Sequence, residues 1–178
     1  MNTDRHFLKN TLSGNKFPEV SFLNLHVLIK AGMTLFLILY LSSLYLSDSA
    51  KNVPMDEITQ EMEADTTVTL LKKRGRTDLK RYYQLDEQDI NGYLFYKDIS
   101  PMSVDELFIV QTNSSTQAEA CLESAQAHLE SQKKVFEGYG TDQMALLGNA
   151  VVEKKGNYVY YFCGADADQW KQAFLDLI

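Results

Sequence analysis

The sequence predicts an α+β protein in which one N-terminal transmembrane helix precedes a single domain of antiparallel sheet, with about four strands packed against helices. Three observations support this class. Residues 25–46 are almost wholly apolar, and at about 1.5 Å per residue they form about 33 Å of helix, enough to cross a hydrocarbon core of roughly 30 Å. About 125 residues follow, which is the size of one ordinary domain. Within them helical and strand patterns alternate in the order α-β-β-α-β-β-α.

Charges on either side of the apolar run predict how the chain crosses the membrane. Basic residues precede or enter the run, at Arg5, Lys9, Lys16 and Lys30, whereas Lys51 stands among acidic residues beyond it. Cytoplasmic flanks of transmembrane helices carry the excess of lysine and arginine. We therefore expect a cell-membrane protein with a short cytoplasmic tail at 1–24, a signal anchor at 25–46, a linker at 47–54 and an extracytoplasmic domain at 55–178.

The alternative to an anchor is a cleaved secretory signal. A basic region, an apolar region and the small residues Ser47, Ser49 and Ala50 follow one another in the order of a signal peptide. The apolar run is nevertheless longer than the usual signal core of about 7–15 residues, and no A-x-A site follows it. The sequence therefore favours an uncleaved anchor. Lipid attachment at this junction is excluded, because the cysteines are Cys121 and Cys163.

The charge of the chain narrows the class of partner. The formal net charge is −7, and residues 1–30 hold four basic and two acidic groups, which leaves −9 on the rest. An acidic outer domain disfavours nucleic acid and anionic lipid as general partners. The partner that the sequence itself assigns is the lipid bilayer, through residues 25–46.

The first elements of the outer domain are helical. Pro54 can begin a helix whose apolar residues Met55, Ile58 and Met62 recur at helical spacing, to about Ala64. The run KKRGRTDLKR at 72–81 then holds six basic residues. It has two interpretations, a patch for anionic envelope polymers or headgroups, and a solvated loop followed by a short helix at 77–83. The second is favoured, because charge runs are usually solvent-exposed.

Two strands and a long helix come next. The strands are the aromatic run 93–96 and the apolar run 107–110. Thr116 and Glu119 have the spacing of a capping box, which predicts that a helix begins there and ends at Gly138. One face of this helix is predicted to be buried against the sheet, with the apolar residues Ala118, Leu122, Ala125, Leu129 and Phe136.

The remaining patterns predict a short helix, a hairpin and a last helix. Thr141 can cap the short helix, which runs to 147, and the hairpin joins 150–154 to 158–163 through a turn at 155–157. Asp166 and Gln169 form a second capping-type pair, before a helix with Trp170, Ala173, Phe174 and Leu177 facing inward. Strands 107–110 and 158–163 are apolar on both faces and are predicted to be central.

The closest match to a metal site is the segment 87–98, which has the spacing of a calcium-binding EF-hand loop. Its first and last positions are Glu87 and Asp98, where such loops use Asp and the longer Glu, and an aromatic strand follows the glycine instead of a helix. We therefore expect no metal, and a turn in which Asn91 and Gly92 supply positive φ angles.

Other candidate chemistry is also weak. Cys121 and His128 lie about two helical turns apart, roughly 10 Å, which is beyond hydrogen-bond reach. The two cysteines can in principle pair in an exported domain, but free buried thiols are favoured. No phosphate-binding loop, cofactor motif or nucleophile elbow is present, so we assign no cofactor and no catalytic residue. A hydrolase with scattered carboxylates is left open, and requires a cleft that joins at least two of Asp89, Asp105, Asp142 and Asp166.

A family resemblance rests on several segments: FEGYGTDQMALL at 136–147, NAVV at 149–152, KGNYV at 155–159, MSVDEL at 102–107, Asp89 and Val110. Together they resemble the bacterial domain-of-unknown-function family 4358, over residues 56–174. The resemblance implies a small, membrane- or lipid-anchored envelope protein, with no assigned catalytic residue. The absence of a lipobox cysteine favours the helical anchor for this chain.

We therefore expect a non-enzymatic binding module of the bacterial cell envelope, whose partner is another envelope protein or a wall polymer. Tyr139, Asp142 and Gln143 are candidate contact residues, because a turn between packed elements presents side chains without disturbing the core. They can equally serve only to cap and pack. A glycan-binding module is the third class, and needs several tyrosines exposed in one flat patch. Tyr93, Tyr96, Tyr158 and Tyr160 lie on strands, where burial is expected.

Overall fold

The computed structural model describes residues 22–47 and 49–178, and it divides into two compact units, Met1–Ser47 and Asp48–Ile178. The predicted cytoplasmic tail at 1–24 lies almost entirely outside the described residues. In the first unit a single helix, α1, spans Phe22–Ser47. Its segment His26–Ser43 is long and apolar enough to cross a membrane, and none of its side chains is buried. A membrane anchor and a signal sequence share these properties.

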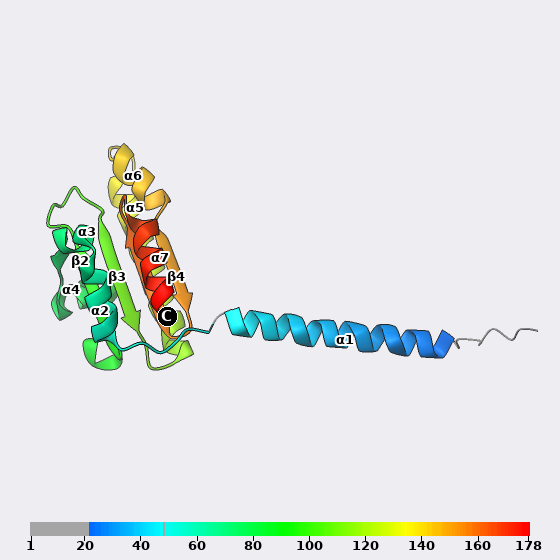
Figure 1. The fold of residues 1–178 in the computed structure, drawn as a ribbon. Coiled ribbons are helices and arrows are strands. Elements are labelled where there is room, and N and C mark those ends of the chain that lie inside the picture. Colours follow the sequence, from blue (N-terminus) through cyan, green and yellow to red (C-terminus); the bar gives the residue numbers. More distant parts are fainter. Residues whose placement is uncertain (1–21, 48) are drawn as a thin grey trace, which may run out of the picture. The chain divides into compact units, whose positions relative to one another are not determined.

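The second unit is built on a five-stranded antiparallel sheet in the order β1-β2-β3-β5-β4 (Figure 1). The strands are β1 Lys72–Lys73, β2 Gly92–Lys97, β3 Glu106–Gln111, β4 Val151–Lys155 and β5 Tyr158–Cys163. The prediction of about four strands is wrong by one, because β1 has only two residues and both are lysines, which carry no apolar alternation. The prediction that β3 and β5 are internal is confirmed.

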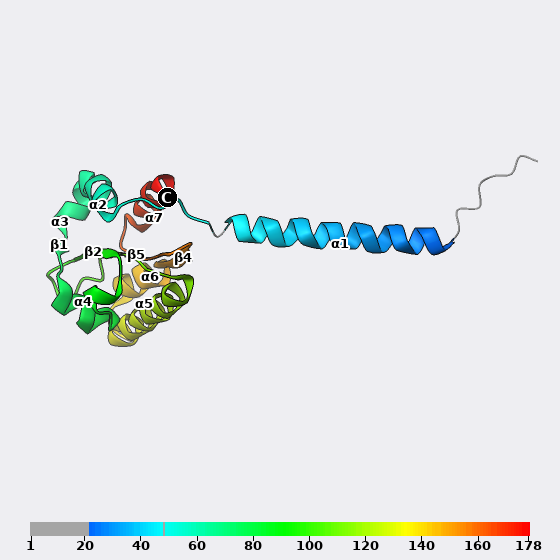
Figure 2. The ribbon, with the colours of Figure 1, turned by 90° about the horizontal axis from the view of Figure 1, so that it is seen from below.

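Helices cover both faces of this sheet, as Figure 2 shows, with α2, α3 and α7 on one side and α4, α5 and α6 on the other. Their bounds are α2 Met55–Ala64, α3 Thr66–Leu70, α4 Arg76–Tyr83, α5 Ser115–Phe136, α6 Thr141–Gly148 and α7 Ala167–Leu177, and a 3-10 turn, η1, spans Glu87–Asp89. The domain is therefore a three-layer α/β/α sandwich. Its element order differs from the predicted α-β-β-α-β-β-α, since α3 and β1 follow α2. The short helices α4 and α6, which that order leaves out, match the short helices predicted at 77–83 and 141–147.

Strand alternation divides the apolar residues between two cores. In β3, Leu107 and Ile109 face α2 and α7, whereas Phe108 and Val110 face α4 and α5. All six residues of β3 and of β5 are buried. This explains why the apolar residues of these strands run continuously instead of alternating with polar ones.

The sheet-facing line of α5 differs from the predicted one. Its buried residues are Ala118, Cys121, Ala125, His128 and Phe136, whereas Leu122 and Leu129 are only half-buried. The helix also begins earlier than predicted, since the side chain of Ser114 accepts a hydrogen bond from the Gln117 amide. The buried positions are those of the polar residue His128 and the small residue Cys121, and not those of the leucines that follow each of them. In the last helix Trp170 and Phe174 are buried as predicted, but Ala173 is exposed. The side chain of the N-cap residue Asp166 makes no capping hydrogen bond, contrary to the predicted capping pair.

Two details of the domain, at Gly92 and at Val53, depart from expectation. Gly92 is not among the glycines with positive φ, and a Cβ atom there would lie 2.6 Å from Met55 Cγ, so close packing is what requires this glycine. Val53, in the segment predicted as a linker, is 2 % exposed. The Tyr158 hydroxyl accepts a hydrogen bond from the Val53 amide at 2.9 Å and donates one to the Val53 carbonyl at 2.8 Å. The chain is therefore fastened to the sheet before α2 begins.

Candidate functional site

A buried carboxylate lies at the centre of the candidate site. Glu106, the first residue of β3, is fully buried and accepts three hydrogen bonds. The donors are Tyr83 Oη at 2.6 Å, Lys97 Nζ at 2.6 Å and His128 Nε2 at 3.0 Å. The sheet brings Lys97 directly opposite Glu106 in the β2–β3 register, while α4 supplies Tyr83 and α5 supplies His128. We call these four residues the Glu106 cluster.

The cluster keeps Glu106 charged. Burial by itself raises the pKa of this carboxyl, but the hydrogen bond from His128 and the positive charge of Lys97 outweigh burial and lower the pKa to about 2. Burial, and then the charge of Glu106, raises the pKa of Tyr83 well above its usual value, so its hydroxyl remains a donor. The Lys97 ammonium balances the carboxylate charge, which a buried ion pair requires.

His128 connects this cluster to the surface. Its side chain lies among the rings of Tyr82, Tyr83 and Tyr161, with centroids 5.6, 4.9 and 5.6 Å away. Because Glu106 is ionised, the Nε2–H group of His128 donates a hydrogen bond to the carboxylate. The other ring nitrogen, Nδ1, has no hydrogen-bond partner in the described part of the chain, although His128 lines an open pocket. Nδ1 is therefore the ring nitrogen that is left for a hydrogen bond with a ligand.

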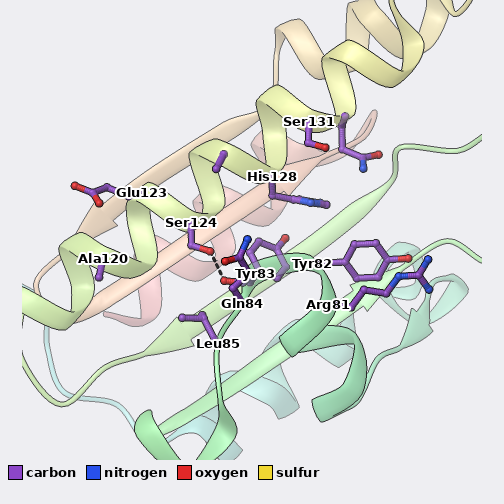
Figure 3. Close-up of a pocket in the computed structure, with 12 residues that line it drawn as sticks. Arg81, Tyr82, Tyr83, Gln84, Leu85, Ala120, Glu123, Ser124, His128 and Ser131 are labelled. Carbon is purple, nitrogen blue, oxygen red and sulfur yellow. Dashed lines mark hydrogen bonds between the residues drawn. The ribbon is translucent and has the colours of Figure 1, made fainter.

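The pocket lies between α5 and the C-terminal end of α4 and has a volume of about 630 Å³ (Figure 3). We call it the α4–α5 groove. Its lining is Arg81, Tyr82, Tyr83, Gln84 and Leu85 on one wall, and Ala120, Glu123, Ser124, Ala127, His128, Ser131 and Gln132 on the other. The volume is within the range of about 300–1,000 Å³ that is usual for ligand sites.

Small side chains keep the groove open. Ala120, Ser124, Ala127 and Ser131 recur at helical spacing on one side of α5, so no long side chain fills the space above His128. The Ser124 hydroxyl donates to the backbone carbonyl of Tyr83, which joins the two walls, as the dashed line in Figure 3 shows. From residue 120 to residue 132 the α5 wall is about 18 Å long, at about 1.5 Å per residue.

The predicted contact residues lie elsewhere. Tyr139 is 62 % exposed in the turn between α5 and α6 and rests on the ring of Phe136, 5.8 Å away. Asp142 is exposed in the first turn of α6, and Gln143 is partly exposed beside it. None of the three lines the α4–α5 groove. They remain candidates for a separate surface contact.

The open carboxylate hypothesis gains no support from this pocket, since its lining includes none of Asp89, Asp105, Asp142 and Asp166. The Asp105 carboxylate accepts a hydrogen bond from the Ser103 hydroxyl at 2.7 Å, so it has a local structural role. At Asp89 it is the backbone carbonyl that accepts a hydrogen bond, from Asn113 at 3.1 Å. Within residues 22–47 and 49–178 no group of three or more metal-ligating side chains occurs, and η1 and β2 occupy the segment that matched a calcium loop.

The basic run and the cysteines have structural explanations. The run folds into β1 and α4, and three of its cations pair with carboxylates, Lys73 with Glu63, Arg74 with Asp78 and Lys80 with Asp86. Cys121 and Cys163 are free and buried, as predicted. Burial raises the pKa of the Cys121 thiol to about 11 and that of Cys163 to about 12, so both are poor nucleophiles.

Sequence reasoning missed the Glu106 cluster. A signal was present for His128, because it continues the helical spacing of Ala118, Cys121 and Ala125 and so belongs to the buried face of α5. Glu106 directly precedes one apolar run and Lys97 directly follows another, and in the sequence both look like exposed charges that flank a strand. Their pairing became visible only with the β2–β3 register.

Fold and site together define an α/β/α domain with an internal ionic cluster beneath an open groove, preceded in the chain by an apolar helix. The model of the family "Domain of unknown function (DUF4358)" matches residues 62–164, more than half of the chain. The chain therefore belongs to this family, which confirms the resemblance noted in the sequence. The matched segment contains the whole Glu106 cluster and the whole groove lining. No curated protein and no solved structure matches the chain.

Proposed function

We propose that this protein is a single-pass membrane protein of the bacterial cell envelope, whose outer domain is a non-catalytic binding module. Its ligand site is the α4–α5 groove, and its ligand is another envelope protein or a wall polymer. The apolar helix α1 and the excess of basic residues before it support the anchor and its orientation. The site itself is supported by residues of the domain alone.

One observation carries the proposal. A buried, charge-balanced cluster fixes His128 so that Nδ1 is free at an open groove whose other polar side chains are mainly uncharged. A buried ion pair is costly to form, and replacing it with apolar residues is often neutral or stabilising. A fixed polar group at the floor of an open pocket is, by contrast, what gives a ligand site its orientation and specificity.

A hydrolase is a second candidate, because a carboxylate that orients an imidazole leaves the other nitrogen as a general base. The hydroxyl of Ser124 lies one helical turn from His128, but it donates to the Tyr83 carbonyl and not to the imidazole. An activated nucleophile donates to its base. The geometry therefore favours binding. Hydrolysis of a simple ester that disappears in His128→Gln would favour the enzyme.

A flat aromatic platform for glycans is not supported by the strand tyrosines. Tyr96, Tyr158 and Tyr160 are buried, and Tyr93 is half-buried. Burial and the hydrogen bond to Glu63 raise the pKa of the Tyr96 hydroxyl, and this hydroxyl is already used as a donor within the domain. These side chains stabilise the sheet and are not offered to a ligand.

Photocrosslinking in living cells tests the binding role. A photoreactive residue at Ala127, in the otherwise unchanged full chain, is expected to form one dominant adduct with an envelope protein or with wall material. The matched control is Gln126, its neighbour on α5, which is exposed but does not line the groove. Equal adducts from both positions, or no adduct from Ala127, would contradict the groove as the ligand site.

A further inference from the structure

Two charged residues line the α4–α5 groove, Arg81 on the α4 wall and Glu123 on the α5 wall. Arg81 on the α4 wall makes no ion pair in the described part of the chain, and the same holds for Glu123 on the α5 wall. Adjacent charges on the same helices are paired, Lys80 with Asp86 and Glu119 with Lys154. The groove lining thus includes one cation and one anion that make no ion pair within the described residues.

Other polar groups complete the lining. His128 offers its ring nitrogen Nδ1, and the amides of Gln84 and Gln132 offer both donors and acceptors. Arg81 lies over the ring of Tyr82, with Cζ 5.4 Å from its centroid, which limits the freedom of its side chain. Donors and acceptors of this kind match a ligand whose own backbone alternates between the two.

We propose that the groove binds an extended peptide segment that carries one acidic and one basic side chain. This inference rests on the proposed binding function and names the chemistry of its ligand. Arg81 pairs with the acidic side chain, Glu123 pairs with the basic one, and His128 Nδ1 accepts a hydrogen bond from a backbone amide. The α5 wall of about 18 Å accommodates roughly five extended residues, at about 3.3 Å each.

Charge argues for a peptide over an anionic polymer. The chain beyond residue 30 carries a net charge of −9, and the groove contributes a single available cation. Repeated phosphates or carboxylates would be repelled by this field. A neutral glycan would leave Arg81 and Glu123 without partners, whereas a peptide with both charges satisfies them at the same time.

A peptide array tests the inference with a defined probe. The full chain in detergent micelles is applied to pentapeptides that contain Ala, Glu and Lys in every order. The strongest binders are expected to hold Glu and Lys in one fixed order, about tenfold above the reversed order and above all-alanine, because only that order satisfies Arg81 and Glu123 together.

A charge exchange supplies the decisive variant. In the double variant Arg81→Glu with Glu123→Arg the preferred order of Glu and Lys is expected to reverse. The control exchanges the exposed pair Glu130 and Lys133, which lies on the same helix outside the groove lining, and should leave the order unchanged. A preference that survives the groove exchange would overturn the proposal.

Ligand-side changes test the role of His128 without altering the fold. N-methylation of the selected pentapeptide at each amide in turn removes one N–H at a time, and one position is expected to lose about tenfold in affinity. Equal tolerance at every amide would overturn the hydrogen bond to Nδ1. If chitotetraose displaced bound peptide and the array showed no preferred order of Glu and Lys, the ligand would be a glycan and the peptide proposal would be wrong.

If a photoreactive residue at Ala127 still formed an adduct in cells, the groove would remain a binding site, and only its assignment to a peptide would fail.

Discussion

Replacing Glu106 with alanine is expected to lower the free energy of unfolding of the outer domain by about 3–5 kcal/mol, because it leaves the buried ammonium of Lys97 without a counter-charge. Lys97 is 8 % exposed and Glu106 is fully buried, so water cannot replace the lost carboxylate. Tyr83 and His128 lose their acceptor at the same time. Denaturant unfolding of the full chain in micelles, followed by tryptophan fluorescence, measures the loss. A domain stability of about 5–15 kcal/mol makes such a change easy to detect.

The conservative variant Glu106→Gln isolates the charge and predicts a pH dependence. The pKa of Glu106 is lowered from 4.5 to about 2 in the folded domain. Its contribution is therefore complete above about pH 4.5 and disappears as the pH falls towards 2, by on the order of 3 kcal/mol. Wild type should lose more stability than Glu106→Gln across this window. Parallel pH curves would contradict an ionised Glu106, and Glu130→Ala, in an exposed ion pair, should change stability by less than about 0.5 kcal/mol.

The second large effect is expected on the opposite face of the sheet. Phe174→Ala should cost about 3–5 kcal/mol, because truncation of a buried aromatic leaves a cavity that neighbours fill only in part. Phe174 is fully buried, and its ring lies 5.8, 5.1 and 6.2 Å from the rings of Tyr158, Tyr160 and Phe162. The same unfolding measurement reports the loss. It also tests the prediction that α7 packs against the sheet.

The matched control is another aromatic residue, in an exposed turn. Tyr139→Ala removes a ring that is 62 % exposed and should change stability by less than about 0.5 kcal/mol. If Tyr139→Ala destabilised the domain as much as Phe174→Ala does, the assignment of the α7 side of the sheet as a principal core would be wrong.

Periodicity predicted most of the elements and fewer of their contacts. The apolar runs of β3 and β5 are correctly placed as internal strands, since continuous burial on both faces requires continuous hydrophobicity. Strand β1 was missed because its two residues are both lysines, which show no apolar alternation. The face of α5 was misjudged because leucine was weighted above cysteine and histidine. Both of these residues are often buried when a partner or a tight contact is available.

The candidate site was beyond sequence reasoning for a physical reason. Its members come from four elements, and Tyr83 and His128 stand 23 and 22 positions from Glu106 in the chain. A single sequence does not give strand register or helix rotation, and both are needed to bring these groups together. The turn residues Tyr139, Asp142 and Gln143 were chosen from exposure in a loop, which identifies accessible side chains but not a pocket.

The proposed place of this protein in the cell envelope depends on one claim above all, that α1 is an uncleaved anchor and that the domain lies outside the cytoplasm. Protease added to intact spheroplasts measures this directly, with antibodies against both ends of the chain. The account predicts that the domain is digested while about the first 25 residues stay protected, as expected if residues 25–46 span the membrane with the basic flank inside. A domain protected from the protease, or a mature chain that begins near Ala50 or Lys51, would contradict it.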